Sequence, residues 1–286
     1  MSTPRLIDIH SHINFNAFKD DADVVIQRTL DGDVWTILVG SQIDTSRRAV
    51  EYAEKYLEGI FAAVGLHPIH LSDMYVDIAE VDAGKGVSGF KTRVERFSYD
   101  AYKSLAEHTK TVAIGECGLD YYRIPEHETG NMEQIKRLQS ETFRQQIALA
   151  REVKKPLMIH CRNAYEDLLR ILREENAKEI GGDVHFFAGS WDTAKQFLDL
   201  GFYLSFTGVL TFTHDYDEVV KNVPLDRIMV ETDSPYVTPV PYRGKRNEPL
   251  FVEYTARKIA EIKKLPEENV FWQLVENTRK CFNKLG

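Results

Sequence analysis

The stretch Pro156-Leu-Met-Ile-His-Cys-Arg162 is a short apolar run that ends in polar residues, and Ala164–Asn176 follows it with helical spacing. Asp183-Val-His-Phe-Phe187 then repeats the apolar run. Apolar, β-rich runs of this length are typical of buried parallel strands. A strand, a helix and a second strand in this order predict a βαβ unit, in which the helix crosses over a parallel sheet.

The same alternation extends over the whole chain. We predict eight strands, at Arg5–Ile9, Val34–Val39, Ile60–Val64, Thr111–Ile114, Pro156–Ile159, Asp183–Phe187, Phe202–Phe206 and Arg227–Val230. The predicted helices are Asp23–Leu30, Thr45–Leu57, Tyr99–Lys110, Glu133–Val153, Ala164–Asn176, Trp191–Leu200, Asp215–Asn222, Glu248–Ile262 and, as one more, Glu267–Leu285. Eight strand–helix repeats indicate an α/β protein of the (β/α)8 barrel type. A doubly wound open sheet has the same local pattern, so repetition alone leaves both folds open.

Length and composition bound the class of protein. The chain has 286 residues, of which 43% are hydrophobic and 28% charged, and these values exclude a disordered or fibrous protein. No Pro/Gly/Ser-rich linker divides it, so we predict a single domain over residues 1–286, since an α/β barrel reaches ~250 residues as one domain. Leu71–Ser98 is the one long irregular piece, and we expect an inserted loop after the third strand.

Charge and cysteine content limit the partners and the compartment. The formal net charge of −8 argues against broad electrostatic binding to nucleic acid, but leaves a small basic patch or bound cations open. Three cysteines without a disulfide framework fit a reducing compartment. No apolar stretch approaches the ~18 residues of a membrane span, and the N-terminus lacks a secretory signal. We therefore expect a cytoplasmic protein with no membrane partner and no obligate protein partner; for a eukaryotic chain the nucleus is also open.

Residue types that bind metals close the predicted strands. The first strand ends in Asp8-Ile-His-Ser-His12, where His10 and His12 share a face because alternate strand residues point the same way. Four other strand ends carry Glu116, His160, His185 and Asp233. In a barrel these ends meet at the C-terminal face, where active sites lie. Each residue alone has an ordinary explanation, such as a helix cap or a turn, but five strand ends together predict a divalent-metal site.

Six motifs in this chain resemble the TatD family of metal-dependent deoxyribonucleases, in the family's order and over nearly the whole chain. They are Asp8-Ile-His-Ser-His12, Gly65-Leu-His-Pro68, Ile114-Gly-Glu-Cys-Gly-Leu-Asp-Tyr121, His160-Cys-Arg162, His185-Phe-Phe-Ala-Gly189, and Glu231-Thr-Asp-Ser-Pro-Tyr236 with Arg243-Gly-Lys-Arg-Asn-Glu-Pro249. The resemblance implies a TIM barrel with two divalent metal ions. It implies that Glu116 bridges both ions. One site would be completed by His10, His12 and Asp233, and the other by His160 and His185.

The resemblance also implies catalytic roles for Glu116 and Asp233, since Asp233 would both bind one ion and accept the proton of the attacking water. A carboxylate-bridged pair of cations suits phosphodiester hydrolysis, because the water must lose a proton and the phosphate oxygens gain charge. Histidine and carboxylate ligands fit Mg, Mn, Zn or Co and do not choose among them.

Candidate substrate contacts surround these residues. They are His67 at the end of the third strand, Arg162 beside His160, Tyr236, which can stack on a base, and Arg243 and Lys245 in a local basic loop that also contains Arg246. We predict that the substrate is DNA, with RNA left open. An enclosed site at one end of the barrel admits the end of a DNA strand more easily than the middle of a duplex. We therefore expect an exonuclease that acts on single-stranded or frayed DNA ends. Its 3′–5′ polarity rests on the resemblance.

Two other functions stay open. The alternative is a metal-dependent hydrolase of a small amide, ester or phosphotriester on the same barrel. Many enzymes of that kind bridge their metal ions with a carboxylated lysine at the end of the fourth strand. This chain has Glu116 at that position, and the difference favours the nuclease. A scaffold with structural metals ranks third, because structural zinc sites are usually rich in cysteine.

Two features depart from the family pattern: Asn163 replaces an acidic residue of many members, and Leu71–Ser98 is longer than expected.

Overall fold

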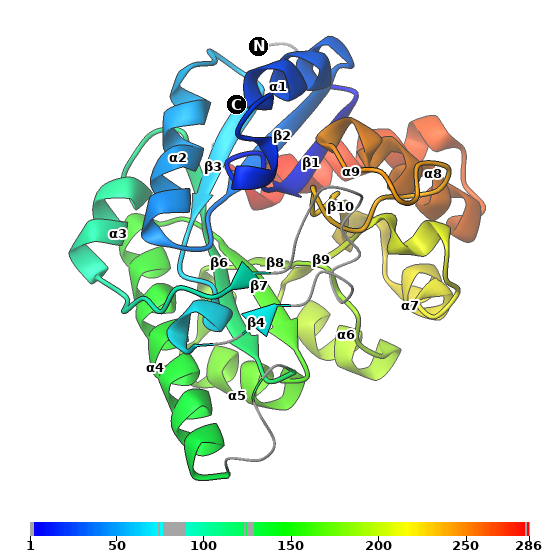
Figure 1. Cartoon of the computed structure of the whole chain (residues 1–286). Helices are drawn as coiled ribbons and strands as arrows, with labels where there is room; N and C mark the ends of the chain where they lie inside the picture. Colours follow the sequence, from blue (N-terminus) through cyan, green and yellow to red (C-terminus); the bar gives the residue numbers. More distant parts are fainter. Residues whose placement is uncertain are drawn as a thin grey trace.

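A computed structural model of the chain describes residues 3–73, 75–76, 90–122, 124, 129–283 and 285. Eight parallel strands form one sheet, and in Figure 1 the helices lie around the outside of it. In sheet order the strands are β1 (Leu6–Ser11), β2 (Val34–Val39), β3 (Ile60–Val64), β6 (Thr111–Asp120), β7 (Leu157–Arg162), β8 (Gly182–Val184), β9 (Tyr203–Phe206) and β10 (Ile228–Val230). All eight predicted strands are present. The main difference is β6, which runs six residues beyond its predicted end at Ile114.

The first and last strands meet and nearly close the sheet into a barrel. The backbone N–H of Asp233 donates to the carbonyl of His10 (2.9 Å), and the N–H of His12 donates to the carbonyl of Ser234 (2.8 Å). These bonds lie just beyond β10, beside the parallel bridge between Ser11 and Ser234. The predicted TIM barrel is therefore confirmed, and the doubly wound open sheet is excluded. The closure also places the ends of β1 and β10 side by side.

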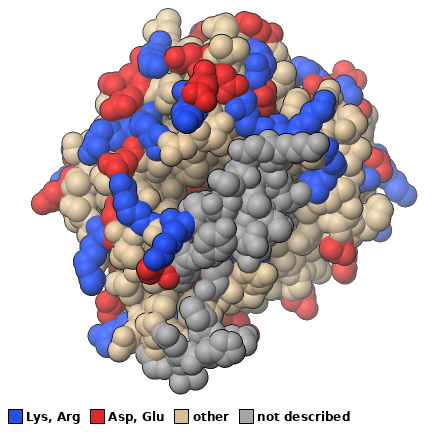
Figure 2. All heavy atoms as spheres, in the orientation of Figure 1, with Lys and Arg blue, Asp and Glu red and all other residues tan. Residues whose placement is uncertain are grey.

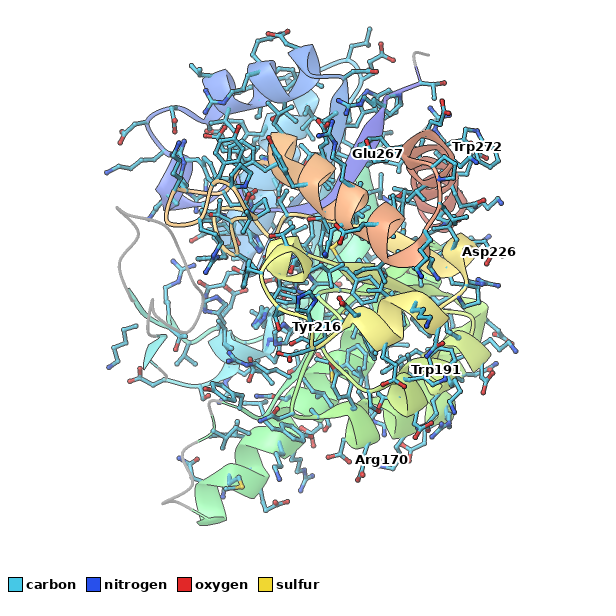
Figure 3. The ribbon with its side chains drawn as sticks, turned by 90° about the vertical axis from the view of Figure 1, so that its right-hand side faces the viewer. Arg170, Trp191, Tyr216, Asp226, Glu267 and Trp272 are labelled. Carbon is cyan, nitrogen blue, oxygen red and sulfur yellow. The ribbon has the colours of Figure 1, made fainter. Side chains whose placement is uncertain are left out.

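Nine α-helices cover the barrel within the described residues. They are α1 (Ala22–Asp31), α2 (Ile43–Glu54), α3 (Tyr99–Ala106), α4 (Thr129–Val153), α5 (Tyr165–Glu174), α6 (Trp191–Asp199), α7 (Asp217–Asn222), α8 (Val252–Lys263) and α9 (Glu267–Cys281). Each overlaps the predicted helix at its position. Figure 3 views the shell from the side of α7, α8 and α9.

Local sequence signals explain where these helices start and stop. Ser190 caps α6 by accepting a hydrogen bond from the N–H of Thr193. Helix α8 stops after Lys263, where the C-cap residue Lys264 adopts the left-handed conformation. Pro266 then precedes α9, whose first turn carries two glutamates. In α5 the buried positions Leu168, Leu169 and Ile171, Leu172 follow the helical period. The helices therefore turn apolar faces to the strands and leave the strand ends free for polar residues.

Gly118 explains how β6 can extend so far beside β7. Its φ of +136° is unfavourable for residues with a side chain, and a Cβ here would overlap the carbonyl oxygen of His160. Glycine therefore allows β6 to run close to β7, where Gly118 pairs with His160 and Asp120 pairs with Arg162. The extension brings Asp120 to the same edge of the barrel as His160.

The segment Leu71–Ser98, predicted as an irregular loop, lies partly outside the described residues. Its described parts include a short antiparallel pair, β4 (Tyr75–Val76) with β5 (Phe90–Lys91). The carboxylate of Glu95 accepts hydrogen bonds from the Tyr102 hydroxyl (2.7 Å) and from the N–H of Ile43 at the start of α2 (3.2 Å). The segment therefore begins with some sheet structure and ends in contact with a helix N-terminus.

The described helices were also checked for membrane spans. Among the residues that the structure describes, no helix combines the length and the apolar character needed to cross a bilayer.

Candidate metal centre

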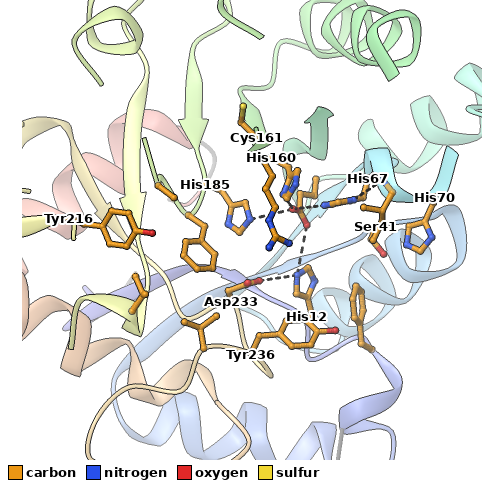
Figure 4. A pocket seen from close by; sticks show the side chains of 18 of the residues that line it. His12, Ser41, His67, His70, His160, Cys161, His185, Tyr216, Asp233 and Tyr236 are labelled. Carbon is orange, nitrogen blue, oxygen red and sulfur yellow. Dashed lines mark hydrogen bonds and ion pairs between the residues drawn. The ribbon is translucent and has the colours of Figure 1, made fainter. Parts of the chain in front are cut away.

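A cavity of about 390 Å³ opens at the carboxyl ends of the strands (Figure 4). Its floor contains His12, Glu116, His160, His185 and Asp233, which come from five different strand ends. His10 lies beneath them and is fully buried. All six residues that the sequence predicts as metal ligands therefore lie close together, at the edge of the barrel where the pattern of strand ends places them.

Glu116 lies at the centre of this group. Its Oε1 is 3.1 Å from His160 Nδ1, 3.1 Å from His67 Nε2 and 3.3 Å from His185 Nε2. Its Oε2 faces the other side, 3.4 Å from His10 Nε2 and 3.9 Å from His12 Nε2. One carboxylate thus turns each of its oxygens to a different set of imidazoles, as a bridge between two cations requires.

Asp233 completes the side that faces Glu116 Oε2. Its Oδ1 is 3.3 Å from His12 Nε2 and 3.9 Å from His10 Nε2, and the two imidazole Nε2 atoms are 3.2 Å apart. Asp233 adopts a positive φ of 55°, a conformation that Asp and Asn tolerate better than most residues. The side chain is 14% exposed, so it reaches the cavity while its backbone closes the barrel.

Hydrogen bonds on the outer nitrogens orient three of the histidines. His12 Nδ1 lies 3.0 Å from the Val39 carbonyl, which can only accept, so the proton is on Nδ1 and the Nε2 lone pair faces the cluster. His185 Nδ1 lies 3.1 Å from Glu231, and His160 Nε2 lies 3.0 Å from Asp120. We assign these outer nitrogens as donors to the carboxylates. The inner nitrogens then face the oxygens of Glu116 and Asp233, where each can donate a proton to a carboxylate or, without that proton, bind a cation.

His67 differs from these three histidines. Its Nδ1 accepts a hydrogen bond from the N–H of Ile69 (3.1 Å), so the proton of the neutral ring lies on Nε2 and points to Glu116. Burial lowers the pKa of His67 to about 4, which keeps the ring neutral near pH 7. Although His67, Glu116 and His160 are close enough to share an ion, the bond from Ile69 makes His67 a donor to Glu116. His67 therefore lies within the cluster as a hydrogen-bond donor to Glu116.

The donor set fits divalent cations. The sets His10, His12, Glu116 and His10, His185, Asp233 each bring three donor atoms within 4.8 Å of one another. Their lone pairs face one another, an arrangement that is costly when buried unless protons or cations lie between them. Imidazole nitrogen and carboxylate oxygen together suit zinc, manganese or cobalt, and carboxylates suit magnesium. The residues present are therefore those that a metal centre needs.

The electrostatics of the cluster support the same conclusion. Burial alone would raise the pKa of the Glu116 carboxyl, but the surrounding imidazoles of His67, His185 and His10 hold it well below its ordinary value. Burial alone would lower the pKa of His185, but the Glu231 and Glu116 carboxylates raise it well above its ordinary value. The carboxylates are thus held as anions at the bottom of the cavity, in a position to balance positive charge.

Sequence reasoning missed the supporting roles of Asp120 and Glu231. Both are buried, and Glu231 also accepts a hydrogen bond from the N–H of Phe186 (2.6 Å). A signal was present: Asp120 lies four residues after Glu116, and Glu231 lies two residues before Asp233, which is the spacing of one strand face. Carboxylates that bind the outer nitrogen of a metal-binding histidine fix its ring orientation and tautomer.

We therefore expect Glu231→Gln to weaken metal binding by about 10- to 100-fold, because the glutamine amide cannot hold the His185 proton as a carboxylate does. Titration of the metal-free protein with Zn²⁺ against a competing chelator measures this affinity. The matched control is Glu261→Gln, on the exposed side of α8. Equal affinities for Glu231→Gln and the parent protein would show that Glu231 does not support the ligand.

The predicted substrate contacts divide into two groups. His67, Arg162 and Tyr236 line the cavity, and the Arg162 guanidinium lies 3.5 Å from the ring centroid of Tyr122.

Arg243 and Lys245 are exposed and lie outside the cavity lining. Arg243 nevertheless approaches the cavity, because its guanidinium covers the ring of Phe212, a lining residue, at 3.8 Å.

The third basic residue of this loop has a structural role. Arg246 forms two hydrogen bonds with the Asp21 carboxylate, at 2.9 and 2.6 Å, and covers the ring of Phe18 at 4.2 Å. It therefore anchors the loop to the segment before α1, and the basic loop carries less charge for a substrate than its sequence suggests.

Asn163, which departs from the family pattern, is exposed and has a φ of +55°. Asparagine suits this left-handed conformation. His160 is hydrogen-bonded to the Asp120 carboxylate, so it has an acidic partner even though residue 163 is not acidic.

Comparison with known proteins gives a consistent result. The family model described as TatD related DNase matches residues 7–283. The chain is 40% identical over 283 residues to YabD of Bacillus subtilis, an uncharacterized metal-dependent hydrolase, covering 97% of this chain and 98% of the relative. It is 32% identical over 283 residues to YcfH of Escherichia coli K12, which has the same description, covering 97% and 96%.

A solved structure shares the fold. The TatD homologue YJJV of Escherichia coli K12 superposes with a TM-score of 0.78 at 24% identity, covering 99% of each chain. At this identity the likeness concerns the fold. With the family match over nearly the whole chain and the strand-end cluster of histidines and carboxylates, the chain belongs to the TatD family and is a metal-dependent hydrolase of the TatD type.

Proposed function

We propose that this hydrolase is a deoxyribonuclease that removes nucleotides from single-stranded or frayed DNA ends, in the 3′–5′ direction, with two divalent metal ions. The observation that carries the proposal is the position of Glu116, whose two oxygens face separate sets of imidazoles at the floor of a cavity. When bound, two divalent cations activate a water molecule and offset the charge that develops on phosphate oxygens. The ligands would be His10, His12, Asp233 and Glu116 for one ion, and Glu116, His160 and His185 for the other.

The chain's own residues supply the remaining parts of phosphodiester hydrolysis. Asp233 is the most exposed carboxylate of the cluster, so its Oδ atoms can accept a proton from a water molecule in the cavity. His67 donates to Glu116 and holds it in position. Arg162, at the cavity wall, supplies positive charge for a phosphate oxygen. The positions of these side chains in the cavity support the proposed roles.

The shape and charge of the molecule favour the ends of DNA strands as the substrate. A cavity of about 390 Å³ is at the small end of the ~300–1,000 Å³ range for sites that hold one small ligand, so it suits a terminal nucleotide. On the described part of the face shown in Figure 2, basic and acidic side chains are interspersed, whereas binding along a duplex favours a continuous basic track. Arg243, whose guanidinium covers the ring of the cavity-lining residue Phe212, would contact a phosphate next to the terminal nucleotide, and Lys245 in the same loop would contact another. Tyr236, which lines the cavity, would contact a base. The free cysteines are consistent with a cytoplasmic site of action.

The test compares linear and circular single-stranded DNA of one sequence, incubated separately with Mg²⁺, Mn²⁺, Zn²⁺ and Co²⁺. We expect mononucleotides from the linear strand, with a 3′ label released before a 5′ label, and an intact circle. Equal cleavage of the circle would make the enzyme an endonuclease. If no oligonucleotide is cut while p-nitrophenyl esters or phosphotriesters are, the small-molecule hydrolase is the correct function.

A further inference from the structure

The cavity has two unlike sides. Figure 4 shows Tyr216 on the far side of His185 and Asp233 from His67 and His70. The segments that follow β8, β9 and β10 contribute the lining residues Phe186, Val209, Phe212, Tyr216 and Val237, which we call the aromatic wall. A substrate whose phosphate lies at the histidines and carboxylates would place its neighbouring group against this wall.

The aromatic wall is assembled by segments that directly follow three strands. Phe186 comes two residues after β8, Phe212 and Tyr216 lie between β9 and α7, and Val237 follows β10. Phe186 and Val237 have positive φ values of 46° and 54°, which are rare for residues of their kind. Such backbone outliers persist where the surrounding structure enforces them, and they concentrate at ligand sites.

Phe212 presents an aromatic ring to water inside a cavity. Its side chain is 40% exposed, and the Arg243 guanidinium covers its ring at 3.8 Å from the centroid. Phe186 lies beside the predicted metal ligand His185, with 6.1 Å between the two ring centroids. One aromatic ring of the wall therefore lies next to a predicted ligand, and another lies beneath Arg243.

We propose that the aromatic wall binds the base of the terminal nucleotide by stacking, while its phosphate lies at the metal centre. This inference rests on the proposed nuclease function. A nucleobase is flat and has a π face, and aromatic side chains bind successive bases without regard to sequence. Among the five wall residues the Tyr216 hydroxyl is the one polar side-chain atom, so hydrogen-bond readout of the base is limited. The wall thus favours a base over no base, and does not select one base from the other three.

The test uses two oligonucleotides that differ at the attacked end, where one carries its base and the other an abasic sugar. The parent enzyme is expected to prefer the base-bearing end by about 10-fold in kcat/KM, through a lower KM. In Phe212→Ala this preference should fall below about 2-fold. Phe212→Leu keeps apolar area but loses the ring, so its preference should lie between those of the parent and of Phe212→Ala. Because Phe212 is partly exposed, the substitution removes little from the core.

Trp272→Ala is the matched control, because Trp272 is 63% exposed on α9 and lies apart from Tyr216 in Figure 3. It should keep the parent's preference. The four bases at the attacked end should be removed at rates within about threefold of one another. If the parent cuts both ends equally, or Phe212→Ala keeps the full preference, the aromatic wall does not bind the base, although the nuclease function stands. If the parent cuts neither oligonucleotide, the nuclease function itself fails.

Discussion

Glu116→Ala is expected to lower kcat/KM by at least about 10³-fold and to reduce the metal content of both sites together. The reason is that a single side chain approaches both sets of imidazoles, with Oε1 facing His160 and Oε2 facing His10. Cations at such a centre contribute several kcal/mol of transition-state stabilisation, and each ~1.4 kcal/mol corresponds to a tenfold change in rate. Metal analysis of the purified variant after dialysis, together with single-stranded DNA turnover, measures both effects.

Two further variants separate bridging from folding. Glu116→Gln keeps the shape of the side chain and loses the charge, so it should share the loss of metal and remain folded. Glu268→Ala removes an exposed glutamate from the first turn of α9 and should behave as the parent does. If Glu116→Ala retained two ions per chain and ordinary turnover, the bridging role would be wrong.

Asp233→Asn is expected to reduce kcat by about 10²- to 10⁴-fold while the metal-free protein keeps nearly its parent melting temperature. The loss follows from removing the carboxylate that we propose accepts the proton of the attacking water. The backbone should be preserved, because asparagine also tolerates the positive φ at 233 and the N–H that bonds to the His10 carbonyl is unchanged. Single-turnover kinetics and thermal unfolding of the metal-free protein measure the two properties.

Asp226→Asn, an exposed substitution at the position labelled in Figure 3, is the control for a change of one charge. The role of Asp233 would be contradicted by a large drop in melting temperature with unchanged activity per folded molecule. That pattern would mean that its side chain stabilises the closure between β1 and β10 and takes no part in the reaction.

The barrel and its ligand positions could be predicted because both depend on short-range patterns. Strand–helix alternation recurs along the chain, and a strand end fixes where its last side chain points. The end of β6 was predicted too early, at Ile114, because the glycines around Glu116 and Cys117 resemble a turn. Its extension depends on the close approach to β7 at Gly118, which is a tertiary contact.

The remaining parts of the site depend on contacts between distant segments. The proton position on His67 follows from the N–H of Ile69, and therefore from the conformation of one loop. The ion pair of Arg246 with Asp21 joins residues that are far apart in the chain, so the basic loop seemed more available than it is. The aromatic wall has no sequence period, since its members come from three separate segments after β8, β9 and β10.

The meeting of β1 with the end of β10 has a consequence for biosynthesis. His10 and His12 emerge from the ribosome first, and Asp233 follows only after almost the whole barrel has been made. Chains are synthesised from the N-terminus, and a binding site rarely exists before the segments that form it have folded. A nascent chain that lacks Asp233 thus carries His10 and His12 with Glu116 but without the second carboxylate that faces them. We therefore expect the cation that would bind His10, His12, Glu116 and Asp233 to be acquired only after nearly the whole chain has been made.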